Sequence, residues 1–159
     1  MTMVLYPGTF DPMTFGHMDL ATRALKIFDR VLIAIGVNPK KNPIFSVEER
    51  AEMIRIVLDD DRIEVDFYEG LTVHYAAKRG IYTVIRSLRT LDEYESEIAM
   101  TTANRLMLPE FESIYLPPNP QYAHISSTLV RVIAEYGGDL SPFVPPHVEA
   151  RLKEIFSNT

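Results

Sequence analysis

Cysteine is missing from this chain of 159 residues. Without it there can be neither a disulfide framework nor a cysteine-liganded zinc site, and the composition fits a reducing compartment. Uninterrupted apolar runs all fall short of the length that spans a bilayer, and the opening MTMVLYPGTF lacks the basic and apolar segments of a secretion signal. We therefore expect a cytoplasmic protein with no membrane partner.

A basic excess is also missing. Lys and Arg number 16 against 22 Asp and Glu, for a formal net charge of -6. This balance argues against a surface that seeks nucleic acid or anionic lipid, so we expect no nucleic-acid partner. Any phosphate site must then be a local cluster of Lys and Arg.

Two glycine-rich phosphate turns are absent as well. The chain has neither GxGxxG nor GxxxxGK[ST], which disfavours a redox flavoprotein and a GTPase. The first apolar run leads instead into YPGTFDPMTFGH, residues 6–17.

Short apolar runs alternate with segments of helical period along the whole chain. The runs predict strands over 3–6, 31–37, 63–68, 82–85 and 113–116. The helical patterns cover 17–28, 46–57, 71–79, 92–108, 128–136 and 145–156, with Ser46 and Glu49 spaced as a capping box. This alternation predicts a single α/β domain over residues 1–159, a Rossmann-like doubly wound fold with a five-stranded parallel sheet and helices on both faces.

Ligands of open parallel sheets bind outside the carboxyl ends of the strands. The segments that follow the predicted strands are PGTFDPMTFGH, NPKKNP, EG, RSLR and PPNPQYAHISST. Four of these five carry groups suited to a phosphate or a nucleobase. The sequence therefore predicts a nucleotide site at that edge of the sheet.

His17 stands near the predicted start of a helix, where N–H groups and the helix dipole attract anions. Its imidazole can donate a hydrogen bond to a phosphoryl oxygen as charge develops there. A lone His more often caps a helix or fills a core, but Thr9 and Gly16 beside it favour a functional role.

The segment GTFDPMTFGH resembles the (H/T)xGH signature of the nucleotidyltransferase superfamily. Together with NPKKNPIFSVEER, RSLRTLDEYESE, ANRLMLPE and ISSTLVR, in that order and spacing, it resembles the bacterial phosphopantetheine adenylyltransferase family over nearly the whole chain. The resemblance implies transfer of the adenylyl group of ATP to 4'-phosphopantetheine in coenzyme A biosynthesis, giving dephospho-coenzyme A and pyrophosphate. It also implies Mg²⁺ with the ATP, and a homohexamer. We assign no residue of this chain as a metal ligand.

Such a transfer needs no strong base, because the acceptor phosphate is already an anionic nucleophile. It needs positioning and charge stabilisation in an in-line displacement at the α-phosphorus. The resemblance implies catalytic roles for His17, Lys41 and Arg89. Lys41 would orient the acceptor phosphate together with Thr9, although a loop lysine is more often merely solvated.

The resemblance also divides the substrate contacts into two sets. The implied acceptor contacts are Thr9, Lys41, Thr72, Arg86 and Asn104. The implied ATP contacts are Thr9, Phe10, His17, Ser87, Leu88, Arg89, Glu97, Tyr122, Ala123, His124, Ile125, Ser126, Ser127 and Thr128.

Several of these residues have a plainer interpretation. Arg86 and Arg89 can converge on a polyphosphate, or can form surface salt bridges. Glu97 alone indicates a solvated helix surface, and either Ser126 or Ser127 can simply cap a helix. Ser87 departs from the family, which usually has RGLR here, and its Cβ restricts close approach of the backbone to a ligand.

Three other functions remain open from the residues alone. A cytidylyltransferase or a nicotinamide-nucleotide adenylyltransferase shares the xGH and ISST-like elements. A non-catalytic nucleotide-binding module would bind ATP without releasing pyrophosphate.

Three other histidines, His74, His124 and His147, have no setting comparable to that of His17, and we assign them no catalytic role.

Overall fold

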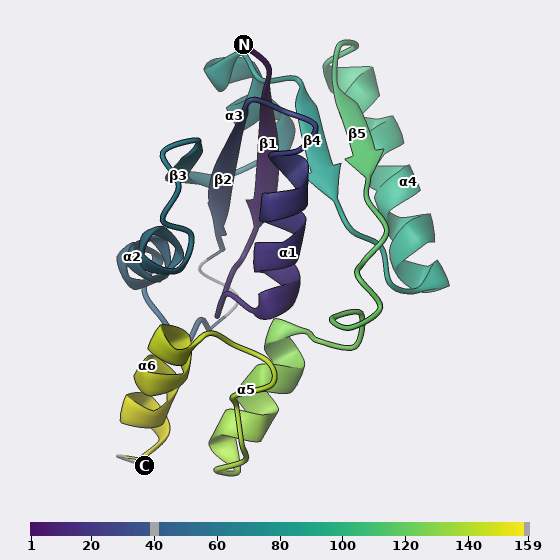
Figure 1. Ribbon diagram of the computed structural model, residues 1–159. Helices are drawn as coiled ribbons and strands as arrows, with labels where there is room; N and C mark the ends of the chain where they lie inside the picture. Colours follow the sequence, from purple (N-terminus) through teal and green to yellow (C-terminus); the bar gives the residue numbers. More distant parts are fainter. Residues whose placement is uncertain (39–41, 158–159) are drawn as a thin grey trace.

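The computed structural model describes residues 1–38 and 42–157. Within them, five parallel strands form one sheet in the order β3-β2-β1-β4-β5 (Figure 1). The strands are β1 (Met3–Gly8), β2 (Arg30–Val37), β3 (Ile63–Glu69), β4 (Thr83–Arg86) and β5 (Glu112–Tyr115). The predicted parallel sheet and its five strands are confirmed.

The helices are α1 (Phe15–Ala24), α2 (Val47–Val57), α3 (Thr72–Arg79), α4 (Leu91–Met107), α5 (Ser127–Glu135) and α6 (Pro146–Phe156). The capping box of Ser46 and Glu49 is confirmed at the start of α2. The predicted stop of α3 is confirmed too, because Gly80 ends that helix in the left-handed region, with φ +65°.

The limits predicted for α1 were wrong at both ends. The helix begins at Phe15 and ends at Ala24, where 17–28 was predicted. The start differs because Thr14 caps the helix. The end differs because the backbone tightens into turns, with the N–H of Ile27 bonded to the carbonyl of Ala24 at 3.0 Å. Phe28 still packs against the core, so the apolar pattern continues beyond the helix.

Alternating strand residues separate two apolar cores, one on each face of the sheet. Val4 and Tyr6 belong to a cluster with residues of α1 and α2. Leu5 between them belongs to a second cluster, which includes Val73 and Ala76 of α3. The sheet is therefore covered on both faces, as the doubly wound prediction requires.

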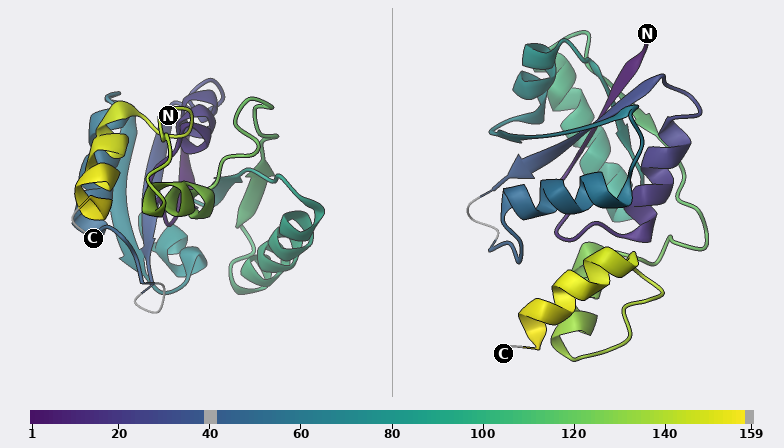
Figure 2. Two further views of the ribbon diagram at one scale, coloured as in Figure 1. Left: turned by 90° about the horizontal axis from the view of Figure 1, so that it is seen from below. Right: turned by 60° about the vertical axis from the view of Figure 1, so that its left-hand side comes forward.

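The two last helices pack as a pair beyond the carboxyl ends of the strands (Figure 1; Figure 2, right). Their apolar residues form a third cluster that includes Val130 of α5, Leu152 of α6 and Met53 of α2. This pair therefore packs against α2 near the carboxyl ends of the strands.

The strand order reverses between β1 and β4. The chain passes from β1 outward to β2 and β3, then crosses to β4 beside β1, where Leu5 is in register with Val84. Such a switch point opens a crevice at the carboxyl ends of the two strands. The turns that follow β1 and β4 therefore face each other.

Within residues 1–38 and 42–157, no helix has the length and apolar character needed to cross a membrane.

Candidate active site

The turn that follows β1 has a tightly folded backbone. Phe10 lies in the left-handed region, with φ +50°, which is uncommon for a residue with a side chain. Its ring folds back over Gly8, where a Cβ would lie 2.8 Å from the ring, so a larger residue at position 8 would force the ring to move. The same ring contacts Tyr6 and His17 edge-on, each at 5.1 Å between ring centroids.

His17 is the third residue of α1, and Thr14 fixes its imidazole. The backbone N–H of Thr14 donates to Nδ1 of His17 at 3.1 Å, while the Thr14 hydroxyl accepts from the His17 N–H at 3.4 Å. Because Nδ1 accepts a hydrogen bond, the proton of the neutral ring resides on Nε2. His17 thus offers a donor on the side of the ring away from Thr14.

The charge state of His17 follows from its surroundings. Burial, and then the nearby Arg89 cation, lower the pKa of His17 from 6.5 to about 4. At neutral pH the imidazole is therefore uncharged. A neutral ring with its proton on Nε2 can donate a hydrogen bond to a developing negative charge, but it brings no positive charge of its own.

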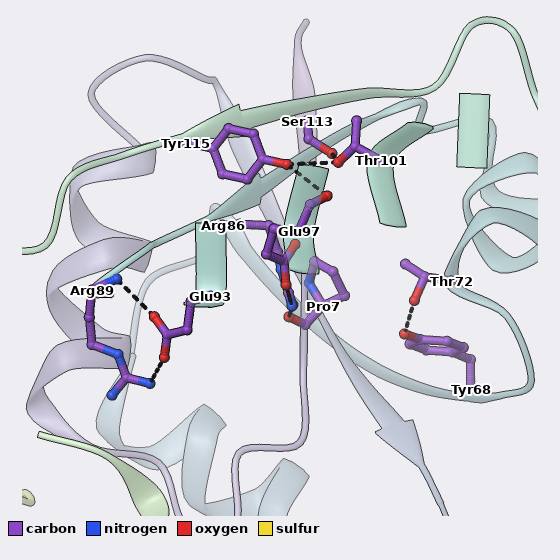
Figure 3. Close-up of polar contacts among 10 residues, drawn as sticks. All are labelled: Pro7, Tyr68, Thr72, Arg86, Arg89, Glu93, Glu97, Thr101, Ser113 and Tyr115. Carbon is purple, nitrogen blue, oxygen red and sulfur yellow. Dashed lines mark hydrogen bonds and ion pairs between the residues drawn. The ribbon is translucent and has the colours of Figure 1, made fainter. Parts of the chain in front are cut away.

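Arg86, the last residue of β4, is held by two elements (Figure 3). Its Nε donates to Glu97 at 3.0 Å, its Nη2 pairs with the other oxygen of that carboxylate, and its Nη1 donates to the carbonyl of Pro7 at 3.0 Å. Burial opposes its charge, but the hydrogen bonds and charge of Glu97 outweigh burial and raise the pKa of the guanidinium. Glu97 lies on α4, so this pair joins the sheet to that helix.

Arg89 joins the same turn to two further elements. Its Nη2 pairs with Glu93 of α4 at 2.6 Å, and the other Glu93 oxygen accepts from the Arg89 N–H at 2.8 Å (Figure 3). Its Nη1 donates to the carbonyl of Ile125 at 2.8 Å. Burial raises the pKa of Glu93, but the hydrogen bonds and charge of Arg89 prevail, and the pKa falls below its ordinary value.

The start of α5 lies against the same group of residues. The Ser126 hydroxyl accepts from the N–H of Leu129 at 3.1 Å, as an N-cap does, and the Ser127 hydroxyl donates to the carbonyl of Pro12 at 2.8 Å. The plain capping interpretation of Ser126 is thus correct. Ser127 instead ties α5 to the turn after β1.

These turns enclose a cavity of about 930 Å³, a size typical of small-molecule sites. Thirteen of the residues predicted to meet substrate line it: Thr9, Phe10, His17, Arg86, Ser87, Leu88, Arg89, Glu97, Tyr122, Ile125, Ser126, Ser127 and Thr128. They come from the segment after β1 and the first turn of α1, from the end of β4 and the segment after it, from α4, and from the segment before α5 together with the first turn of that helix. The expectation that these distant turns meet at one edge of the sheet is confirmed for these residues.

A second cavity, of about 470 Å³, adjoins the first. Pro7, Gly8, Thr9 and Arg86 line both. Thr72 lines only the second, where its hydroxyl lies 2.7 Å from the Tyr68 hydroxyl (Figure 3). The two cavities thus meet at Arg86.

Not every predicted site residue reaches these cavities. Asn104 is buried in the last turns of α4, and neither it nor Ala123 nor His124 lines either of these two cavities. Their assigned contacts stay predictions. Lys41, to which a catalytic role was assigned, lies outside the described residues.

Sequence reasoning missed several residues of the cavity wall. Thr14 is the first residue of TxGH, and its spacing to His17 already suited a cap. Glu93 stands four residues after Arg89, a spacing that pairs charges on a helix. Arg131 also lines the cavity and donates to the Asn42 carbonyl at 3.1 Å, a contact that no local pattern indicates.

Carboxylates do not gather into a metal centre in the part of the chain that the structure describes. No group of three or more His, Asp or Glu side chains there is arranged to hold a metal ion. Mg²⁺ usually takes one or two carboxylates and completes its shell with water and substrate phosphates.

Comparison with known proteins agrees with this geometry. A family model described as cytidylyltransferase-like matches residues 5–133. A bifunctional NMN adenylyltransferase/ADP ribose pyrophosphatase from Francisella tularensis has the same fold, with a TM-score of 0.69 at 20% identity over 99% of this chain and 50% of that chain. The chain is thus an enzyme of the nucleotidyltransferase superfamily.

Two curated relatives define the family more narrowly. Phosphopantetheine adenylyltransferase of Carboxydothermus hydrogenoformans is 43% identical over 157 residues, which are 98% of this chain and 97% of that protein. The enzyme of the same name from Caldanaerobacter subterraneus is 41% identical over 160 residues, the full length of both. The chain belongs to the phosphopantetheine adenylyltransferase family.

Proposed function

We propose that this protein transfers the adenylyl group of ATP to the phosphate of 4'-phosphopantetheine, in coenzyme A biosynthesis. An acceptor phosphate oxygen forms a new bond to the α-phosphorus, and the bond from that phosphorus to the β-phosphate oxygen breaks. The products are dephospho-coenzyme A and pyrophosphate. The observation that carries the proposal is the neutral His17, with its proton on Nε2, in a cavity that also contains Arg86 and Arg89.

The residues at the cavity wall suit this chemistry. The acceptor phosphate carries its own negative charge, so the site needs donors and cations and not a strong base. His17 would donate to an α-phosphoryl oxygen as charge builds there. Arg89 and the N-terminus of α5 would hold the β- and γ-phosphates.

Arg86 stands where two substrates would meet. It lines both cavities, so one substrate in each would bring its phosphate to this guanidinium. We assign ATP to the larger cavity and the acceptor arm to the smaller one beside Thr72. Lys41 and Thr9 would orient the acceptor phosphate, as the family resemblance implies.

Mg²⁺ would accompany ATP. The ion would neutralise the leaving pyrophosphate, and Mg²⁺ bound with a nucleotide is held mainly by phosphate oxygens and water. Chelation with EDTA is expected to abolish pyrophosphate release, and added Mg²⁺ to restore it. Activity that persists in excess EDTA would exclude this part of the proposal.

We propose that the protein is cytoplasmic, as its composition indicates, and that it assembles into the homohexamer that the resemblance implies. Apolar side chains exposed on α4 support self-association: Leu91, Tyr94, Ile98, Met100, Leu106 and Met107. Sedimentation equilibrium is expected to give six times the chain mass of 18.2 kDa. The variant Ile98→Glu is expected to lower that mass, whereas Glu95→Gln on the same helix is not.

Pyrophosphate release tests the reaction itself. The protein is given ATP with 4'-phosphopantetheine, then CTP with the same acceptor, then ATP with nicotinamide mononucleotide. Release only in the first mixture is the expected result. Release only in another mixture would identify a different nucleotidyltransferase, and ATP binding without any release would indicate a non-catalytic module.

A further inference from the structure

Arg50 of α2 is a buried cation that lines neither cavity. Only 3% of its surface is exposed. Its Nη1 donates to the carbonyl of Thr9 at 2.8 Å, and its Nε donates to the carbonyl of Ser46 at 3.3 Å. Burial lowers the pKa of Arg50, and the charges of Asp11 and Glu48 oppose that effect. A guanidinium is kept in such a place when its donors have specific partners.

The peptide group that Arg50 holds is the one between Thr9 and Phe10. In a trans peptide the carbonyl and the N–H point in opposite directions. With the Thr9 carbonyl directed at Arg50 in α2, the Phe10 N–H points away from that helix. Phe10 and Thr9 both line the cavity. The bond from Arg50 therefore sets the direction in which this N–H faces.

Phe10 needs such support because its φ of +50° is a conformation that surrounding structure must maintain. On its other side, the Asp11 carboxylate accepts from the N–H groups of Ile44 and Phe45, at 2.8 and 3.1 Å. Arg50 and Asp11 thus hold the turn from both sides of Phe10. The Phe10 ring, in turn, lies against the His17 imidazole.

We propose that Arg50 is a positioning residue for adenylyl transfer. By holding the Thr9 carbonyl it fixes the Phe10 N–H and ring, and through that ring the imidazole of His17. Arg50 itself touches no substrate. The inference rests on the proposed function, because it concerns the placement of donors for that reaction.

The variants Arg50→Gln and Arg50→Lys test the proposal. Misplacement of donors by about 1 Å can cost about 100-fold in rate, so we expect kcat of Arg50→Gln to fall about 10- to 100-fold. Each KM is expected to rise less than kcat falls. Arg50→Lys keeps one donor and is expected to recover part of the loss. Arg55→Gln is the matched control, because Arg55 of the same helix donates to the Val65 carbonyl at 3.0 Å and lines neither cavity.

A double-mutant cycle with His17→Ala separates positioning from general stability. If Arg50 acts through His17, Arg50→Gln should cost at least about threefold less in the His17→Ala background than in the wild type. Equal losses in both backgrounds would overturn the proposal. Far-UV circular dichroism and thermal unfolding establish that each variant is folded before its rate is compared.

The outcomes distinguish this inference from the function on which it rests. A wild-type protein that releases no pyrophosphate would contradict the proposed function. An active wild type, together with a folded Arg50→Gln variant that keeps kcat within about threefold, would overturn only the role of Arg50. If Arg50→Gln does not fold, a folded Arg50→Met variant, which has no donor for the Thr9 carbonyl, would overturn it equally by keeping kcat within about threefold.

Discussion

The backbone N–H of Thr14 donates to Nδ1 of His17 across 3.1 Å, in the first turn of α1. This contact belongs to a capping box, since the Thr14 hydroxyl accepts from the His17 N–H in return. One local device therefore starts the helix and fixes the tautomer of its histidine. The proton on Nε2 is the donor that the proposed reaction uses.

Removal of that donor is the most direct test of the mechanism. We expect His17→Ala to lower kcat by roughly two to three orders of magnitude, a loss of about 3 to 4 kcal/mol of transition-state stabilisation, with smaller changes in KM. Steady-state kinetics measure both values. His74→Ala, at an exposed position of α3, is the control and should retain full activity. A His17→Ala enzyme within a few-fold of the wild type would remove His17 from the mechanism.

Stability should depend on pH through the same residue. The pKa of His17 is about 4 in the folded protein and 6.5 when unperturbed, because burial and Arg89 disfavour the charged ring. Between these values the unfolded chain binds a proton that the folded one does not, so the free energy of unfolding falls as pH drops from 6.5 towards 4. Urea unfolding at several pH values measures the slope, which should be shallower in His17→Gln. An unchanged slope would be inconsistent with a neutral His17.

Loss of Arg86 should affect both binding and folding. Arg86→Gln leaves the carboxylate of Glu97, with 18% of its side chain exposed, without its cation. We expect the free energy of unfolding to fall by about 1 to 3 kcal/mol, and the KM of the acceptor to rise at least about tenfold. Urea unfolding and acceptor titration measure the two effects.

Arg105→Gln is the matched control for that prediction. Arg105 pairs with Glu112, but both side chains are about half exposed, at 53% and 52%. An exposed pair of this kind contributes about 0 to 1 kcal/mol. If Arg86→Gln changes stability no more than Arg105→Gln does, then Arg86 and Glu97 form only a surface pair.

Lys41→Ala should weaken the binding of the acceptor more than the binding of ATP. The family resemblance gives Lys41 the acceptor phosphate, and a lysine would serve there as a flexible point charge. Separate titrations with ATP and with 4'-phosphopantetheine compare the two effects, with Lys40→Ala as the neighbouring control. A larger loss of ATP binding would reverse the assignment.

The pairing of Arg86 with Glu97 also shows how the two predicted contact sets meet. The resemblance placed Arg86 with the acceptor and Glu97 with ATP. In the structure both side chains line the larger cavity and are bonded to each other. A substrate phosphate that binds Arg86 must therefore share this guanidinium with a carboxylate from α4.

Local patterns were enough for most of the fold. Apolar runs, a capping box and glycine stops predicted the strands and most helix limits, because neighbours in the chain set those features. The end of α1 was predicted wrongly, since Phe28 continues an apolar pattern by packing and not by helix geometry. In the site, the sequence pointed to His17, Arg86, Arg89 and Ser127, because they follow strands or begin helices.

What the sequence determined by itself was the order of elements, the edge of the sheet where ligands bind and the kind of groups gathered there. Only the tertiary structure decided which carboxylate pairs with which arginine. It also decided that Arg131 donates to the carbonyl of Asn42 and that Arg50 donates to the carbonyl of Thr9. Those contacts join residues that are mostly distant in sequence, and even the near pair of Arg89 and Glu93 depends on where the turn ends. Their geometry comes from the packing of helices on the sheet, which no local spacing encodes.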